Sequence, residues 1–170
     1  AGNCIFLHNI DNYGGEVSWF FQWCFASTCS SIVSGALAER CKMICYVAYA
    51  GYMCVVIYPV ITYWAWSTGG WLSPFNPDES TRLGAGVIDF AGSGVVHMTG
   101  GMAALIGAYF VGPRVDHFYR TDSGEVKARE YTANSQVARA VGVFSLWFGW
   151  YFFNGGTAFT LDYSSNNLVY

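Results

Sequence analysis

Four long apolar stretches limit what this chain can fold into more than any other feature of its sequence. Each exceeds the roughly 20 residues that an α-helix needs to cross a hydrocarbon core about 30 Å thick. The stretches are residues 17–38, 43–64, 87–111 and 137–159. Strands of a membrane barrel would show alternating polarity over about 10 residues, and residues 47–57 do not alternate. The sequence therefore predicts an all-α integral membrane protein with four transmembrane helices.

Composition supports a membrane protein independently of the lengths of the apolar stretches. Hydrophobic residues make up 54% of the chain and charged residues 11%, whereas soluble domains carry about 25% charge. So few charges could not cover a water-exposed surface.

The basic residues predict the orientation. Seven of the eight lysines and arginines fall in the first connection (39–42), in the third connection (112–136) or at Arg139, and only Arg82 lies in the second connection (65–86). The positive-inside rule assigns the basic side to the cytoplasm. We therefore expect a multi-pass protein of the plasma membrane, with residues 65–86 outside the cell.

The cysteines and histidines indicate no metal centre or prosthetic group. No cysteine spacing resembles a zinc site, and small buried apolar packing is the ordinary role of a free cysteine. A haem oxidoreductase of the membrane would need axial histidines, commonly paired, but only His97 falls within a predicted span. We expect no enzyme activity, no cofactor, no metal and no nucleic-acid partner.

His97 is the clearest candidate for a functional side chain, because ionisable groups inside a bilayer are costly. Residues at helical spacing from it are all small: Ser93, Gly94, Gly101, Ala104 and Ala108. Small residues let helix backbones approach one another, so we expect His97 to face protein or a narrow path through protein. A histidine that only hydrogen-bonds a neighbouring helix is the alternative.

Asp89 stands at the predicted outer end of the same helix. A carboxylate there can accept hydrogen bonds from the first free backbone N–H groups and complement the helix dipole. We favour this structural role, and direct attraction of a cation is the alternative.

Aromatic side chains gather toward the predicted outer ends of the helices. Phe21 and Phe25 lie four residues apart on the first helix, Trp66 lies just beyond the second, and Phe153 and Thr157 share a face of the fourth. Aromatic rings attract cations by roughly 0.5 to 2 kcal/mol. A ring cluster at an outer mouth could therefore select a small cation, although Trp66 alone could be an interfacial anchor.

Four motifs in order along the chain resemble those of the ammonium transporter family, the Amt, Mep and Rh proteins. The motif DFAGSGVVHMTGG at 89–101 is similar to the family signature, and FQWCFA at 21–26, GALAER at 35–40 and WFGWYFFNGGT at 147–157 resemble its neighbours. The resemblance implies the third to sixth of eleven helices, in a homotrimer with one pore through each subunit. Because the chain also lacks an initiator methionine, we expect a partial sequence of a larger protein.

The resemblance also assigns an outer recognition site for ammonium. By motif, Phe25, Trp66 and Thr157 form this site, with Phe21 in the vestibule beside it. Many members of the family carry serine where this chain has Thr157, and the hydroxyl is retained. Trp64 is the alternative to Trp66, because the loop that follows varies in length.

Below this site the resemblance implies a gate and a pore. Phe25 and Phe153 resemble the stacked gate, and His97 resembles the first of two pore histidines, the second of which belongs to a later helix. The implied function is transport of ammonium, which releases its proton and passes as ammonia. An ammonium sensor or receptor on the same scaffold is the alternative.

Overall fold

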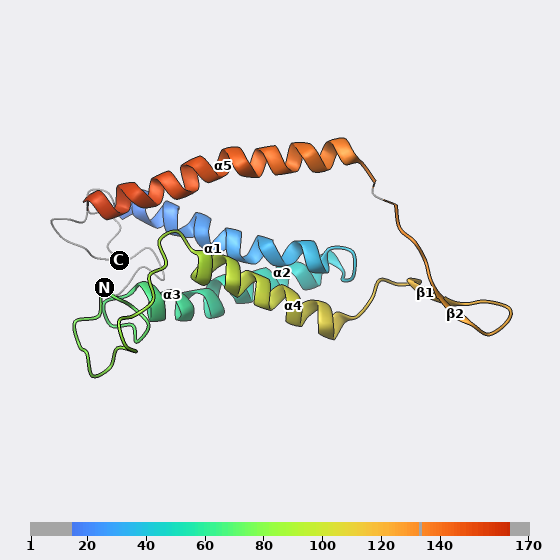
Figure 1. Ribbon diagram of the computed structural model, residues 1–170, viewed down its shortest axis with the longest axis horizontal. Helices are drawn as coiled ribbons and strands as arrows, with labels where there is room; N and C mark the ends of the chain where they lie inside the picture. The colour runs from blue at the N-terminus through green and yellow to red at the C-terminus, as the bar shows by residue number, and fades with distance from the viewer. Residues whose placement is uncertain (1–14, 133, 164–170) are drawn as a thin grey trace. The chain divides into compact units, whose positions relative to one another are not determined.

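The computed structural model describes residues 15–132 and 134–163, and these are mostly helical, as predicted (Figure 1). They fall into two compact units. The first ends at Val111 and the second begins at Gly112. Each unit is described by itself below.

The first predicted helix is α1, Gly15–Leu37. Four of its hydroxyl groups donate to backbone carbonyls three or four residues earlier in the same helix, at 2.6–2.9 Å. The donors are Thr28, Ser30, Ser31 and Ser34. Side chains of this kind satisfy their donors without a partner from another helix, which a helix surrounded by lipid requires.

The second helix runs without a break from Met43 to Trp66. It consists of α2 (Met43–Tyr52), a π-helical segment η2 (Met53–Ile57) and α3 (Tyr58–Trp66). Pro59, near the start of α3, explains the wider segment: it has no N–H, and its ring presses on the carbonyl one turn earlier. The helix ends at Trp66, two residues later than predicted, so this tryptophan lies within it.

The third helix begins later than the sequence predicts. It consists of a π-helical segment η3 (Ser93–Met98) followed by α4 (Thr99–Val111), and residues 87–92 are not helical. Gly92, which precedes it, has a φ of +85° in the left-handed region. Glycine adopts that conformation without the steric cost that a Cβ imposes, so the helix cannot extend back through this residue.

Two of the helices in the described part of the chain are apolar enough to cross a membrane. Met43–Trp66 reaches a mean hydropathy of 1.9 and Ser93–Val111 reaches 1.5, with only 11% and 17% of their most apolar windows buried. A core helix of a soluble protein would instead be mostly buried. Four membrane-spanning helices were predicted, and two of the described helices are apolar enough to confirm that prediction for their own segments. Hydroxyl and amide side chains lower the value for α1, and Arg139, tryptophans and glycines lower it for the last helix.

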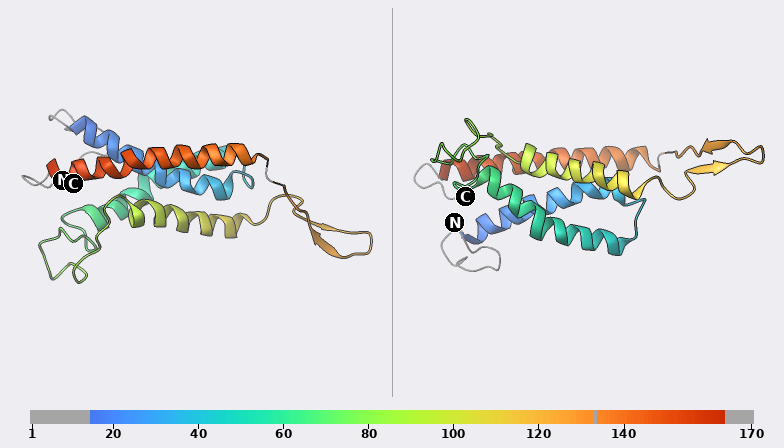
Figure 2. Two further views of the ribbon diagram at one scale, coloured as in Figure 1. Left: turned by 45° about the horizontal axis from the view of Figure 1, so that its top comes forward. Right: turned by 90° about the horizontal axis from the view of Figure 1, so that it is seen from below.

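Glycines let α1 and α4 pack closely in the first unit (Figure 2). A methyl group at Gly100 would come within 2.8 Å of the Cys29 carbonyl oxygen, and one at Gly107 within 3.2 Å of the Leu37 side chain. A methyl group at Gly101, in contrast, would meet no described atom within 4 Å apart from its chain neighbours and the backbone of its own helix. The close approach of α1 and α4 therefore uses Gly100 and Gly107, and Gly101 takes no part in it.

The second unit contains a small hairpin that the sequence analysis did not predict. Strands β1 (Phe118–Arg120) and β2 (Val126–Ala128) pair antiparallel, with Tyr119 opposite Lys127. The turn between them includes Gly124 at a φ of +81°. The predicted all-α fold therefore also carries a two-stranded sheet.

The last helix, α5 (Gln136–Tyr163), starts one residue before the predicted position and runs past its predicted end at 159. The Ser135 hydroxyl accepts a 3.0 Å hydrogen bond from the backbone N–H of Ala138. Serine just before a helix commonly caps it in this way.

Candidate functional site

A cluster of three aromatic rings joins α1 to the end of α3. The ring of Phe25 meets that of Phe21 edge-on, with centroids 4.6 Å apart, and that of Trp66 edge-on at 5.7 Å. Phe25 and Trp66 are 1% and 8% exposed. Trp64 is exposed and packs against Trp71 instead. Of the two candidate tryptophans, Trp66 is therefore the one in contact with Phe25.

Trp66 is held by a hydrogen bond to the segment that precedes the third helix. Its indole Nε1 donates to the backbone carbonyl of Asp89 at 2.8 Å. A buried indole N–H ordinarily needs such a partner. The bond fixes the ring at the point where the chain enters the third helix.

The side chain of Asp89 caps that helix with both carboxylate oxygens. Oδ1 accepts the backbone N–H groups of Gly92 and Ser93 at 2.8 Å each, and Oδ2 accepts those of Gly94 and Val95 at 2.9 and 2.7 Å. The first N–H groups of a helix have no partner within it. One carboxylate supplies partners for them and places its negative charge at the positive end of the helix dipole.

Gly92 connects the aromatic cluster to His97. Its carbonyl accepts the backbone N–H of His97 at 2.9 Å and lies 3.0 Å from the ring nitrogen Nδ1 of the same residue. Because a carbonyl oxygen can only accept, Nδ1 carries the proton in this contact. A methyl group at Gly92 would come within 2.5 Å of Val96 and 3.4 Å of the Phe25 ring, so the helix start packs directly beneath that ring.

Five predicted site residues therefore lie together in the first unit: Phe21, Phe25, Trp66, Asp89 and His97. The half-buried His97 belongs to η3, and π-helical segments occur frequently at functional sites. The orientation predicted for His97 rests on α-helical spacing, which a π-helical segment does not follow.

Phe153 and Thr157 belong to the second unit. They lie one turn apart on α5, where the Thr157 hydroxyl donates to the Phe153 carbonyl at 3.0 Å. The donor of Thr157 is thus used within its own helix, and the lone pairs of its oxygen are available to accept a hydrogen bond.

Polar atoms that the sequence analysis did not single out are also buried in the first unit. Gln22 Oε1, Tyr49 OH and Tyr58 OH have no hydrogen-bond partner among the described residues. Each of these polar groups lies inside a predicted apolar stretch. That position could have identified them in the sequence, because a buried polar group ordinarily has a hydrogen-bond partner. Among the same residues, no group of three acidic, cysteine or histidine side chains could hold a metal ion.

A sequence profile described as the Ammonium Transporter Family matches residues 2–170. The chain belongs to the ammonium transporter family. The family is one of membrane transporters, which is the class that the apolar stretches and the motif at 89–101 predict.

Plant members of the ammonium transporter family are among the similar proteins. The putative ammonium transporter 1 member 5 of Arabidopsis thaliana is 43% identical over 164 residues, which cover 95% of this chain and 32% of that protein. The ammonium transporter 1 member 2 of Oryza sativa subsp. japonica is 43% identical over 156 residues, or 91% and 31%. The ammonium transporter 1 member 1 of Arabidopsis thaliana is 44% identical over 154 residues, or 89% and 30%.

The chain thus spans about a third of the length of the curated ammonium transporters that it matches. No solved structure matches it.

Proposed function

We propose that the whole protein transports ammonium across the plasma membrane through a pore in each subunit. The observation that carries the proposal is the contact of the Phe25 and Trp66 rings at 5.7 Å, next to a helix start that also holds His97. This arrangement combines rings that attract a cation with a histidine deeper in the same unit. Family membership supports ammonium as the substrate.

Recognition takes place at the outer mouth. The faces of Trp66 and Phe25 attract the cation through their quadrupoles, and the Thr157 oxygen accepts one of its N–H groups. Phe21 lines the vestibule beside them. The contact between Phe21 and Phe25, with centroids 4.6 Å apart, supports one continuous aromatic wall.

Passage requires the loss of a proton. Moving a full charge through a narrow apolar pore costs many kcal/mol, whereas a neutral molecule avoids most of that cost. Ammonium therefore releases its proton, which stays behind on water at the outer mouth or is relayed separately, and neutral ammonia passes the Phe25 and Phe153 gate and the His97 lining. Potassium has no proton to release, so the same pore rejects it.

Orientation and assembly complete the proposal. Residues 65–86 face outward and the hairpin of β1 and β2 faces the cytoplasm, because the basic residues concentrate on the hairpin side. The protein assembles as a homotrimer in the bilayer. Later helices supply the second pore histidine.

The alternative is an ammonium sensor, which would use the same recognition site without conduction. Full-length protein in liposomes separates the two: an inward ammonium gradient should produce an internal pH change or a current that empty liposomes lack. Ammonium binding without flux would favour the sensor. If the protein neither binds nor transports ammonium, both functions are contradicted.

A further inference from the structure

The loop that connects α3 to Asp89 is folded back onto the end of α3. The backbone N–H of Leu72 donates to the Trp64 carbonyl at 3.0 Å, and the N–H of Val87 donates to the Leu72 carbonyl at 2.7 Å. A methyl group at Gly70 would come within 2.3 Å of the Trp64 carbonyl oxygen. The loop therefore has an outgoing arm (70–72) in contact with the helix and a returning arm (81–87) bonded to the outgoing one.

Asn76 lies between these two arms and is 3% exposed. Its Nδ2 donates to the Gly70 carbonyl at 3.1 Å in the outgoing arm and to the Thr81 hydroxyl at 3.2 Å in the returning arm. Its Oδ1 accepts the N–H of Asp78 at 2.9 Å. One buried amide therefore ties both arms and fixes the turn between them.

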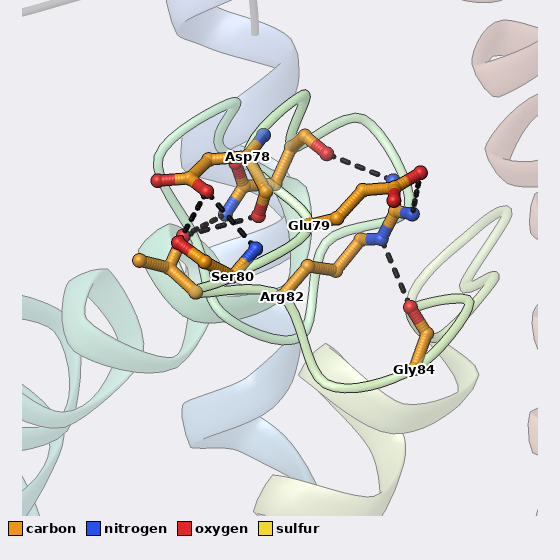
Figure 3. Close-up of polar contacts among 7 residues, drawn as sticks. Asp78, Glu79, Ser80, Arg82 and Gly84 are labelled. Atoms are coloured by element: carbon orange, nitrogen blue, oxygen red, sulfur yellow. Dashed lines mark hydrogen bonds and ion pairs between the residues drawn. The ribbon is translucent and has the colours of Figure 1, made fainter.

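The charged side chains of the loop lie near Asn76, but its amide is the group that bonds to both arms. Arg82 donates to the Asn76 backbone carbonyl at 2.9 Å, and Figure 3 shows its side chain reaching toward Gly84 and Glu79. The ion pair with Glu79 is 3.6 Å long and involves an exposed carboxylate, and exposed pairs contribute little. Hydrogen bonds from Ser80 hold the pKa of the exposed Asp78 below its usual value.

Both arms lead directly to the recognition site. The outgoing arm follows Trp66 at the end of α3, and the returning arm leads through Val87 to Asp89, whose carbonyl holds the Trp66 indole. The hydrogen bonds of Asn76, here called the Asn76 clasp, thus join the two arms whose far ends carry Trp66 and Asp89, in addition to the backbone bond from Val87 to Leu72. We expect that losing the clasp loosens both arms and, through them, the bond between Trp66 and Asp89.

We propose that Asn76 is a positioning residue for ammonium recognition, acting through the loop arms on the bond between Trp66 and Asp89. The inference rests on the proposed function, because Trp66 is the group that it positions. It adds a residue that lies outside the aromatic cluster and makes no contact with the cation.

Two substitutions test the clasp in the full-length protein. Asn76→Ala removes all three side-chain hydrogen bonds, and Asn76→Asp keeps the acceptor for Asp78 but removes both donors. If the two donors matter, both variants should raise the ammonium concentration for half-maximal flux by about threefold to tenfold, with a smaller change in maximal flux. Glu79→Gln is the matched control, because its exposed side chain lies on the same loop and its ion pair with Arg82 of the returning arm is exposed and contributes little.

Hydrogen exchange in the same proteins supplies the structural readout. The amides of Leu72 and Val87 should exchange faster in both Asn76 variants, and their exchange rates should be unchanged in Glu79→Gln. Faster exchange with unchanged half-maximal concentration would overturn the positioning role, as would a raised concentration with unchanged exchange. A raised concentration in Asn76→Ala alone would assign the effect to the Asp78 turn and also overturn it.

The unsubstituted full-length protein separates failure of the inference from failure of the proposed function. If it binds ammonium without flux, the dissociation constant replaces the half-maximal concentration and the same comparison applies. If it neither binds nor transports ammonium, the proposed function and the positioning role both fail. If the unsubstituted protein transports ammonium and both Asn76 variants have the same half-maximal concentration as it does, only the positioning role is contradicted.

Discussion

The indole of Trp66 and the backbone carbonyl of Asp89 are joined by a 2.8 Å hydrogen bond. The same aspartate caps the third helix with its carboxylate, through four backbone N–H groups. One residue thus fixes the aromatic ring with its main chain and the helix start with its side chain. A change at Asp89 should therefore disturb both features together.

Asp89→Asn should destabilise the full-length protein by about 2 kcal/mol or more, because one oxygen that accepts two N–H groups is replaced by a donor and the charge is lost. Thermal unfolding in detergent measures the effect. Asp78→Asn, at an exposed carboxylate in the neighbouring loop, is the control and should change the unfolding temperature much less. Equal effects at the two positions would contradict the capping role.

Trp66→Leu should weaken ammonium uptake affinity or its discrimination against potassium, because the attraction of the ring for a cation is lost while apolar bulk remains. Trp66→Phe separates the two roles of the side chain, since it keeps a ring but removes the hydrogen bond to Asp89. Flux titrations with ammonium and potassium measure both. If Trp66→Leu behaves as the unsubstituted protein, Trp66 is only an interfacial anchor, and Trp64 becomes the residue to test.

His97→Ala should leave the trimer intact and change conduction or ion selectivity, because it removes a polar lining without leaving an unpaired charge. Surface abundance of the trimer, ammonium-dependent current and potassium permeability are measured in the same cells. A histidine with only a structural hydrogen bond would instead lower stability by roughly 1 to 3 kcal/mol. Normal current per trimer with unchanged selectivity would remove His97 from the pore.

Gly100→Ala should destabilise the protein, since the new methyl group would meet the Cys29 carbonyl oxygen at 2.8 Å. Overpacking of this kind costs about 1 to 3 kcal/mol. Gly101→Ala is the neighbouring control, because the described residues leave that position open, and alanine stabilises a helix by up to about 1 kcal/mol over glycine. A larger loss of stability at Gly101 would show that a later helix packs there.

A cysteine at Ser123 should resist impermeant thiol reagents applied outside intact cells, because the hairpin is proposed to face the cytoplasm. Ser123 is exposed at the hairpin turn, so reagent should label it readily once the cells are opened. The background is a full-length protein without other cysteines. Labelling from outside would reverse the orientation.

The sequence predicted the helices well where apolar length decides their position, and less well where backbone chemistry does. Met43 begins the second helix as predicted, because the connection before it is short and charged. The start of the third helix was placed at 87 instead of Ser93, since apolar residues continue through a segment that the left-handed Gly92 and the Asp89 carboxylate exclude from the helix. Hydrophobicity does not report either effect.

The orientation of His97 depended on a helical period that the chain does not keep. A π-helical segment accommodates one additional residue. Ser93, Gly94 and His97 lie in this segment, whereas Gly101, Ala104 and Ala108 lie in α4, so α-helical spacing from His97 does not hold across the two. Gly100 faces α1 instead of Gly101.

The Asn76 clasp and the hairpin show two further limits of the sequence. The partners of Asn76 are set by the fold of the whole loop, so no local pattern identifies them. The turn of the hairpin had a signal, because Ser123 and Gly124 form a dipeptide that is common in turns. Its flanking strands have only three residues each, too few for a clear alternation.

The hydroxyl groups of α1 have a consequence for how that helix can be placed. A hydropathy scale counts four residues of this helix as hydrophilic, yet each hydroxyl already donates its hydrogen bond to a carbonyl of the same helix. These residues are Thr28, Ser30, Ser31 and Ser34. Toward lipid, such a helix presents mainly methylene and methyl groups along with its aromatic rings. It is therefore more compatible with a bilayer than its composition indicates, and its row of hydroxyls is no evidence for a polar path along it.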